Sequence, residues 1–249
     1  QAVPLARIKT DIVGPITASG LSLKPHEDIV ITSESKIEAV TINNVPLVFV
    51  GYGITADEFG WDDYKNIDVT NKIVVSLVSD PGLSSPTLFK GNDTTYYGRW
   101  IYKLEEARRR GALGALIIHE TEAAGYGFHV VQQKNSQLVL NDQNQRLLVQ
   151  GWLSIDAATK IFSKTNSNFE AMKHKSLSPG AALTNLGTLT MKAKNTITLG
   201  QSYNMCGLIE GENSQEYGVI SAHWDHLGSL IDQQGNKSIY RGAIDNGTG

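Results

Sequence analysis

The sequence predicts an α/β fold, and three segments in its first half carry that prediction. Two of them are almost continuous apolar runs: Lys72–Val78, which is rich in β-branched residues, and Ala112–Ile118. Runs of this length and kind are typical of strands that are buried within a sheet. Between them, Gly98–Arg110 has the apolar spacing of a helix, and Gly111 is a natural helix stop. A strand, a helix and a second strand in this order indicate a small α/β unit.

The neighbouring elements are predicted from shorter patterns. Ser154 is a good N-cap residue, so we expect a helix to begin directly after it. Residues 1–45 are predicted to be irregular apart from two short strands. The expected strands are Asp28–Thr32, Ile37–Ile42, Pro46–Gly51 and Leu147–Leu153, and the expected helix begins with Ile155–Phe162.

A second pattern begins near residue 186, and the change in composition there predicts a domain boundary near 185. Leu186–Ala193 alternates apolar and polar residues, which indicates a half-exposed strand. Asn204–Glu210 and Tyr217–Ala222 are expected to be further strands, and the second of these delivers His223 at its end. The single cysteine, Cys206, is interpreted as a small core residue, because its neighbours are apolar.

Composition excludes some partners. The chain has 249 residues, of which 22 are basic and 25 acidic, so its net charge of -3 argues against nucleic acid as the main partner. The densest basic run, Arg108–Arg110, is interpreted as a solvated face of the predicted helix. No apolar stretch approaches the roughly 20 residues that a membrane-spanning helix needs.

The first motif with chemical potential is His223-Trp224-Asp225. A neutral imidazole is a good zinc ligand, and the strand that is expected before His223 would place it at the sheet edge where ligands bind. Asp225 lies two residues on, so in an extended chain it points to the same side and could accept the other N–H of the imidazole. The alternative is an ordinary surface or core pair. We interpret His226 as a structural or neighbouring residue of such a pocket and not as a ligand.

The second motif surrounds Asp245, which stands among glycines in Gly242–Gly249. Glycine allows the backbone to approach a bound ion closely, and a carboxylate can bridge two metal ions about 3.5–4 Å apart. The alternative is a simple glycine-rich turn. Two other histidines, His119 and His129, are interpreted as structural or surface residues.

Taken together, Ser221–Gly228 followed by Gly242–Gly249 resembles the bacterial two-zinc aminopeptidases of the family that includes glutamate carboxypeptidase II and the transferrin receptor. Upstream segments resemble the protease-associated domain that is inserted in the bacterial members. These segments are Leu47–Ile54, Gly60–Tyr64, Asn71–Val75, Tyr96–Trp100, Gly111–Ala112 and Ala115–Glu120. The resemblance covers residues 46–249.

The resemblance implies a fold and a set of roles. Residues 1–45 would be the N-terminal segment of the peptidase portion, 46–185 a protease-associated domain, and 186–249 the start of a mixed-sheet zinc peptidase domain. His223 would bind zinc, Asp245 would bridge two zinc ions, and Asp225 would be a catalytic residue beside the metal. The implied activity is removal of amino-terminal residues from peptides, in the periplasm or after secretion.

In the family, the general-base glutamate and the remaining zinc ligands follow the bridging aspartate. This sequence has four residues after Asp245, so we expect the 249-residue chain alone to be inactive. Two alternatives stay open: a protease-associated binding module, and a relative that kept the fold and lost catalysis. The presence of His223, Asp225 and Asp245 argues against the second.

Overall fold

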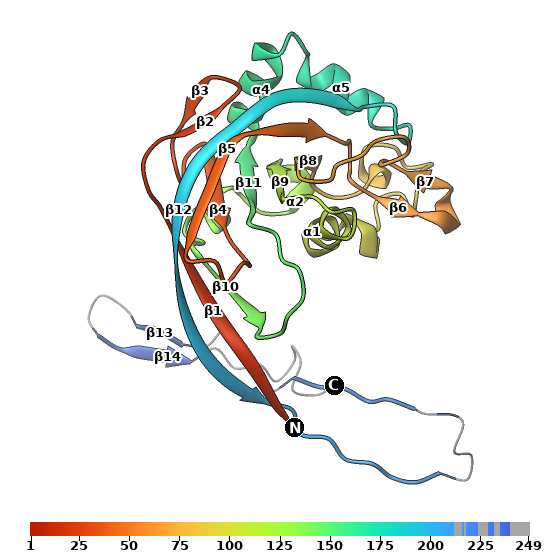
Figure 1. Cartoon of the computed structure of the whole chain (residues 1–249). Helices are drawn as coiled ribbons and strands as arrows, with labels where there is room; N and C mark the ends of the chain where they lie inside the picture. The colour runs from red at the N-terminus through yellow and green to blue at the C-terminus, as the bar shows by residue number, and fades with distance from the viewer. Residues whose placement is uncertain (212–215, 217, 224–228, 232–234, 240–249) are drawn as a thin grey trace. The chain divides into compact units, whose positions relative to one another are not determined.

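The computed structural model describes residues 1–211, 216, 218–223, 229–231 and 235–239. It divides into two compact units, Gln1–Asn204 and Met205–Gly249, which we describe separately. Most of the described structure belongs to the first unit, whose centre is a large mixed sheet (Figure 1).

The sheet contains ten strands, and eight of them form its main path in the order β10-β1-β12-β5-β8-β9-β11-β4. The three pairs β5–β8, β8–β9 and β9–β11 are parallel, and the remaining pairs are antiparallel. The short strands β2 and β3 form a hairpin, and this hairpin joins the sheet because β2 pairs with β12. The strands on the main path are β1 (Ala2–Ile12), β4 (Ile29–Thr32), β5 (Ala39–Phe49), β8 (Ile73–Leu77), β9 (Gly114–His119), β10 (Ser136–Leu140), β11 (Val149–Ser154) and β12 (Thr184–Tyr203); the hairpin is β2 (Ile16–Ala18) and β3 (Leu21–Leu23).

The parallel strands are covered on both faces, as their apolar runs predicted. Every residue of β8 and β9 is buried. Alternate residues face two different apolar clusters: Val74 packs in the cluster that contains α1, whereas Ile73 packs in the cluster that contains α4 and α5. The helices are α1 (Trp100–Arg109), α2 (Thr121–Ala124), α3 (His129–Gln132), α4 (Ile155–Lys164) and α5 (Phe169–Lys175). Short 3-10 turns, η1 (Asp57–Phe59), η2 (Pro81–Leu83) and η3 (Tyr96–Gly98), and the small pair β6 (Thr55–Ala56) and β7 (Trp61–Asp62), occupy the connections.

The helix predictions are confirmed within a few residues. The helix α1 ends before Gly111, which has a left-handed φ of 77°. Ser154 is the N-cap of α4, and its hydroxyl accepts a hydrogen bond of 3.2 Å from the backbone N–H of Ala157. These features depend on neighbouring residues in the chain, which explains why the local sequence is sufficient to predict them.

The description of residues 1–45 as irregular is wrong at its start. The strand β1 pairs along its whole length with β12, and its inward residues Ala6, Ile8 and Thr10 are buried. The intervening Arg7 and Lys9 are exposed, as expected for a strand with one solvated face. The expected strands Ile37–Ile42 and Pro46–Gly51 are one continuous strand, β5.

The predicted strand Leu186–Ala193 is confirmed and forms part of the much longer β12, which has 20 residues. Its first half pairs with β5 and β2, and its second half pairs with β1. This strand crosses residue 185, and the proposed boundaries 1–45, 46–185 and 186–249 stay predictions.

In the second unit, the described residues include one antiparallel pair, β13 (Ser229–Ile231) with β14 (Lys237–Ile239). The strand expected at Asn204–Glu210 is wrong, because residues 204–210 form no strand, and Cys206 is exposed and not a core residue. Residues 218–222 form no strand either, so that prediction is wrong for this described part. An apolar run forms a strand only where another strand pairs with it, and no such partner lies among the described residues. Within the described ranges, no helix is long and apolar enough to span a membrane.

Candidate functional site

The predicted metal site is described only in part. His223 is exposed in a segment without regular structure, and its side chain or backbone takes part in an interaction. Asp225, His226 and Asp245 lie outside the described residues. The structure therefore does not test whether His223, Asp225 and Asp245 come together.

The two sequence motifs contain donor groups that zinc can bind. Imidazole and carboxylate are the donors that zinc takes from proteins, so the side chains of His223 and Asp245 fit the ion chemically. Among the described residues, however, no three His, Cys, Asp or Glu side chains converge on one point. Of the two predicted zinc ligands, His223 lies in the described part of the chain and Asp245 lies outside it.

His119 and His129, which we interpreted as structural or surface residues, lie in the core and at the surface respectively. His119 ends β9 with a relative exposure of 2%, and the rings of Tyr126, Phe128 and Trp152 lie 5.3–5.7 Å from its own. Burial lowers the pKa of His119, and its Nε2 atom has no hydrogen-bond partner within the part of the chain that the structure describes. His129 is exposed at the start of α3.

The first unit also buries a group of charged residues that the sequence did not indicate. The Lys103 ammonium, on α1, donates a 2.6 Å hydrogen bond to the carbonyl oxygen of Tyr52 and lies 5.7 Å from the centre of the Tyr52 ring. Burial lowers the pKa of Lys103 to about 7, although Asp63 and Asp80 act against this shift. Burial likewise raises the pKa of Asp63 to about 6, against a 3.0 Å hydrogen bond from the Ile54 N–H.

These groups have structural partners. The carboxylate of Asp80 accepts hydrogen bonds from the backbone N–H groups of Gly82 and Thr95 at 3.0 and 2.8 Å, and from the Thr95 hydroxyl at 2.6 Å. It thereby fixes the turn after β8. We interpret the group as a clamp between the loop after β5, the loop after β8 and helix α1.

A hollow in the first unit runs between α1 and β10, and we name it the α1–β10 groove. Its cavity volume is about 390 Å³, within the range of small-ligand sites. One wall is a stripe of α1 that begins at Trp100, and the other is β10 with the loop that follows it. The lining residues are Glu34, Trp100, Ile101, Leu104, Glu105, Arg108, Gln137, Leu138, Leu140, Asp142, Asn144 and Arg146.

The charges at the rim of the groove are mostly paired. Arg108 lies 4.0 Å from Glu34, and Arg146 lies 2.9 Å from Asp142. Glu105 is in no ion pair among the described residues, and its carboxylate lies 3.5 Å from the Tyr96 hydroxyl. The three carboxylates outnumber the two guanidinium groups, so the groove has a small excess of negative charge.

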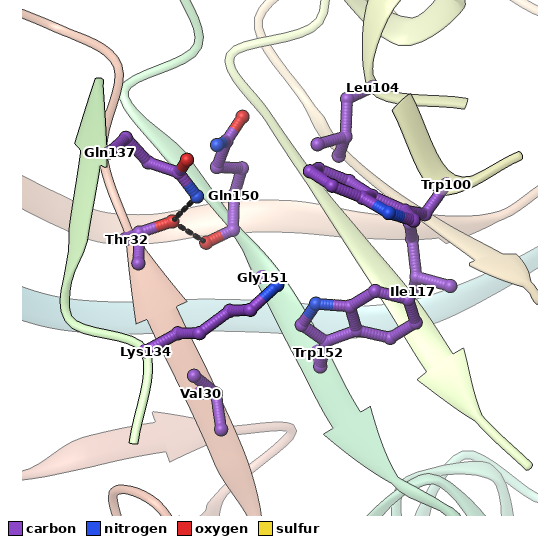
Figure 2. A pocket seen from close by; sticks show the side chains of 10 residues that line it. All are labelled: Val30, Thr32, Trp100, Leu104, Ile117, Lys134, Gln137, Gln150, Gly151 and Trp152. Atoms are coloured by element: carbon purple, nitrogen blue, oxygen red, sulfur yellow. Dashed lines mark hydrogen bonds between the residues drawn. The ribbon is translucent and has the colours of Figure 1, made fainter. Parts of the chain in front are cut away.

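At its inner end the groove continues into a narrow pocket that shares Trp100, Leu104 and Gln137 with it. Figure 2 shows the rings of Trp100 and Trp152 on one side of this pocket and the amides of Gln137 and Gln150 on the other. The Gln137 amide donates a 3.1 Å hydrogen bond to the Thr32 hydroxyl.

Gln150 is the unusual member of this pocket. The residue is 1% exposed, and no donor among the described residues lies within hydrogen-bond distance of its Oε1 atom. A buried carbonyl oxygen without a donor costs about 1–3 kcal/mol. The only sequence signal of this feature is a glutamine inside the otherwise apolar run Leu147–Leu153, which we had interpreted simply as a strand.

Two aminopeptidases are among the solved structures that the chain resembles. No protein-family model and no curated protein matches the chain. An aminopeptidase from Aneurinibacillus sp. strain AM-1 is 15% identical with a TM-score of 0.41, over 81% of this chain and 36% of that one. A zinc aminopeptidase from Bacillus subtilis, BSAP, is 13% identical with a TM-score of 0.29, over 79% of this chain and 35% of that one.

The chain thus spans about a third of the length of the solved structures it matches. Both TM-scores lie below 0.5, so this likeness carries no conclusion about the chemistry of the site. Any conclusion about activity has to come from the residues of this chain.

Proposed function

We propose that this chain is part of a zinc-dependent aminopeptidase that removes amino-terminal residues from peptides. The observation that carries the proposal is the order of two motifs, His223-Trp224-Asp225 and then Asp245 within Gly242–Gly249. Each motif alone is common, but the two in this order resemble the metal-binding segments of the two-zinc aminopeptidases.

The proposed roles follow from the donor chemistry of each side chain. The His223 imidazole and the Asp245 carboxylate would hold the metal, with Asp245 shared between two ions. The Asp225 carboxylate would accept the second N–H of the His223 ring, which orients the ring and increases its basicity. Zinc in such a site supplies a Lewis acid that polarises a carbonyl and lowers the pKa of water.

The same resemblance supports two wider proposals. Residues 46–185 would be an inserted protease-associated domain, and the protein would act in the periplasm or outside the cell. Fractionation of the native host tests the second proposal, because recovery of the protein only from the cytoplasm would contradict it.

The test of the activity uses the full-length protein that carries this chain, with aminoacyl nitroanilides as substrates. We expect exhaustive chelation to abolish turnover and added zinc to restore it. His223→Ala should lose both bound zinc, measured by mass spectrometry, and turnover, while its circular dichroism stays unchanged. Asp225→Asn should keep more metal and lose about 10–100-fold in rate.

The matched control is His129→Ala, because His129 is also an exposed histidine but lies on α3, away from either motif in the sequence. This variant should keep both zinc and turnover. Turnover that survives exhaustive chelation would refute the proposal.

A further inference from the structure

A separate feature of the first unit is the place where the two ends of its sheet approach each other. The main path of the sheet begins with β10 and ends with β4, and no ladder of backbone hydrogen bonds joins these two strands among the described residues. Side chains join them instead. The Gln137 amide on β10 donates a 3.1 Å hydrogen bond to the Thr32 hydroxyl on β4, which in turn lies 3.5 Å from the backbone carbonyl oxygen of Gln150 on β11 (Figure 2). We name this contact between Gln137, Thr32 and Gln150 the seam of the sheet.

The narrow pocket described above lies at this seam. Its walls come from both ends of the sheet and from α1, and all three residues of the seam line it. Two further lining residues are Trp100, at the start of α1, and Lys134, just before β10. The Lys134 ammonium lies 5.2 Å from the centre of the Trp100 ring. The pocket thus has two amides, a hydroxyl and an ammonium around an otherwise apolar space.

The Gln150 side chain requires a hydrogen-bond donor in this pocket. The residue is 1% exposed, and none of the described groups donates to its Oε1 atom. The nearby Gln137 amide nitrogen is already bonded to Thr32, and the Lys134 ammonium is held over the Trp100 ring. The donor therefore has to come from a molecule that enters the pocket.

The size of the pocket limits which molecule can enter. Its cavity volume is about 10 Å³. A cavity needs roughly 10–15 Å³ to hold one water molecule. An organic ligand, or a side chain of another polypeptide, is therefore too large for this space.

The charges around the pocket restrict the occupant in the same way. The Lys134 ammonium disfavours a second cation in so small a space. The Gln150 carbonyl oxygen, which requires a donor, disfavours an anion. A neutral molecule that donates hydrogen bonds is left, and a buried water typically has two to four polar partners. The polar groups of the seam can supply that number.

We propose that the narrow pocket binds one water molecule, which donates one hydrogen bond to Gln150 Oε1 and a second to Gln137 Oε1. The water bridges β11 and β10 and so completes the seam between the two ends of the sheet. Its bond to Gln150 removes the cost of a buried carbonyl oxygen without a donor. This site is independent of the metal motifs and of the aminopeptidase proposal.

The first test is a crystal structure of the 249-residue chain at a resolution that shows ordered waters. We expect one density peak in the pocket, about 2.5–3.0 Å from Gln150 Oε1, as for other O–H···O hydrogen bonds. The same peak should lie within hydrogen-bond distance of Gln137 Oε1. The Lys134 ammonium should remain over the Trp100 ring.

The second test counts long-lived waters in solution by relaxation dispersion of the water nuclei. Gln150→Met removes the acceptor at similar volume, so it should lose one long-lived water relative to the wild type. It should keep its circular dichroism, and its melting temperature should change by only a few degrees. Gln143→Met changes an exposed glutamine in the loop after β10 and is the matched control, so it should keep the wild-type number.

Three results would overturn the proposal. The first is a wild-type crystal structure in which the pocket contains no density. The second is a structure in which the Lys134 ammonium or the Gln137 amide donates directly to Gln150 Oε1, because the carbonyl oxygen would then need no water. The third is an equal number of long-lived waters in the wild type and in a folded Gln150→Met. If Gln150→Met does not fold, the wild-type crystal structure decides.

Discussion

Replacement of Lys103 by methionine should abolish a rise in stability between pH 7 and pH 9. The ammonium of Lys103 is 2% exposed, and burial lowers its pKa from the ordinary value of 10.5 to about 7. Below pH 7 both the folded and the unfolded chain hold this proton, and the folded chain carries the full cost of a buried charge. Between pH 7 and 10.5 only the unfolded chain holds it, so the free energy of unfolding rises with pH.

The size of the effect follows from the number of protons. One proton that is bound by the unfolded chain alone changes the free energy of unfolding by about 1.4 kcal/mol per pH unit. Over two pH units the wild-type chain should therefore gain about 2–3 kcal/mol. Asp63 and His119 contribute little to the change in the free energy of unfolding between pH 7 and pH 9. The raised pKa of Asp63, about 6, and the lowered pKa of His119 both lie below this pH range.

The assay is urea unfolding at pH 7, 8 and 9, followed by tryptophan fluorescence. Lys103→Met loses its hydrogen bond to the Tyr52 carbonyl, so its stability at any one pH changes for several reasons. The change of stability with pH reports the titration of Lys103 alone. In Lys103→Met the free energy of unfolding should therefore not rise between pH 7 and pH 9. Lys160→Met, an exposed lysine within α4, is the matched control and should keep it. A wild-type chain with equal stability at pH 7 and 9, or a rise that persists in Lys103→Met, would refute the reasoning.

Two further predictions concern packing and capping. A side chain at Gly151 would overlap the carbonyl oxygen of Val30 in the neighbouring strand, so Gly151→Ala should cost about 1–3 kcal/mol and lower the melting temperature by roughly 2–12 °C. Gly200→Ala, where no atom lies within 4 Å of the new methyl group, is its control, and an equal fall in both variants would contradict the clash. Ser154→Ala should cost about 1 kcal/mol through the lost bond to the Ala157 N–H, and an unchanged unfolding midpoint would show that the cap contributes nothing.

The parts of the fold that the sequence predicted are those with local causes. β8 and β9 were predicted because each lies in an almost continuous apolar run, and the start of α4 because Ser154 supplies its own cap. The strand β1 was missed because Ala6 and Thr10 are weak signals among charged neighbours. Its state depends on β12, which lies almost 200 residues further along the chain.

The dependence of a strand on its pairing partner also explains why some predicted strands are absent. Residues 218–222 have a strand-like composition, but no strand pairs with them in the described part of the chain. The narrow pocket beside the α1–β10 groove could not be predicted, because Trp100, Gln137 and Gln150 meet only through the order of strands in the sheet. The roles of His223, Asp225 and Asp245 stay predictions, since two of these residues lie outside the described structure.

The pairing of β1 with β12 also bears on how the protein is made. Ala2 pairs with Tyr203, so β1 leaves the ribosome before the other strands of its unit and has to wait for nearly the last residue of that unit. At roughly 5–20 residues per second, translation of this interval takes roughly 10–40 s. The parallel strands β5, β8, β9 and β11 emerge earlier and can assemble first, whereas the apolar residues of β1 stay uncovered on the nascent chain. Within the first unit, β1 is therefore the strand that is exposed longest to chaperones, to proteases and to other unpaired strands.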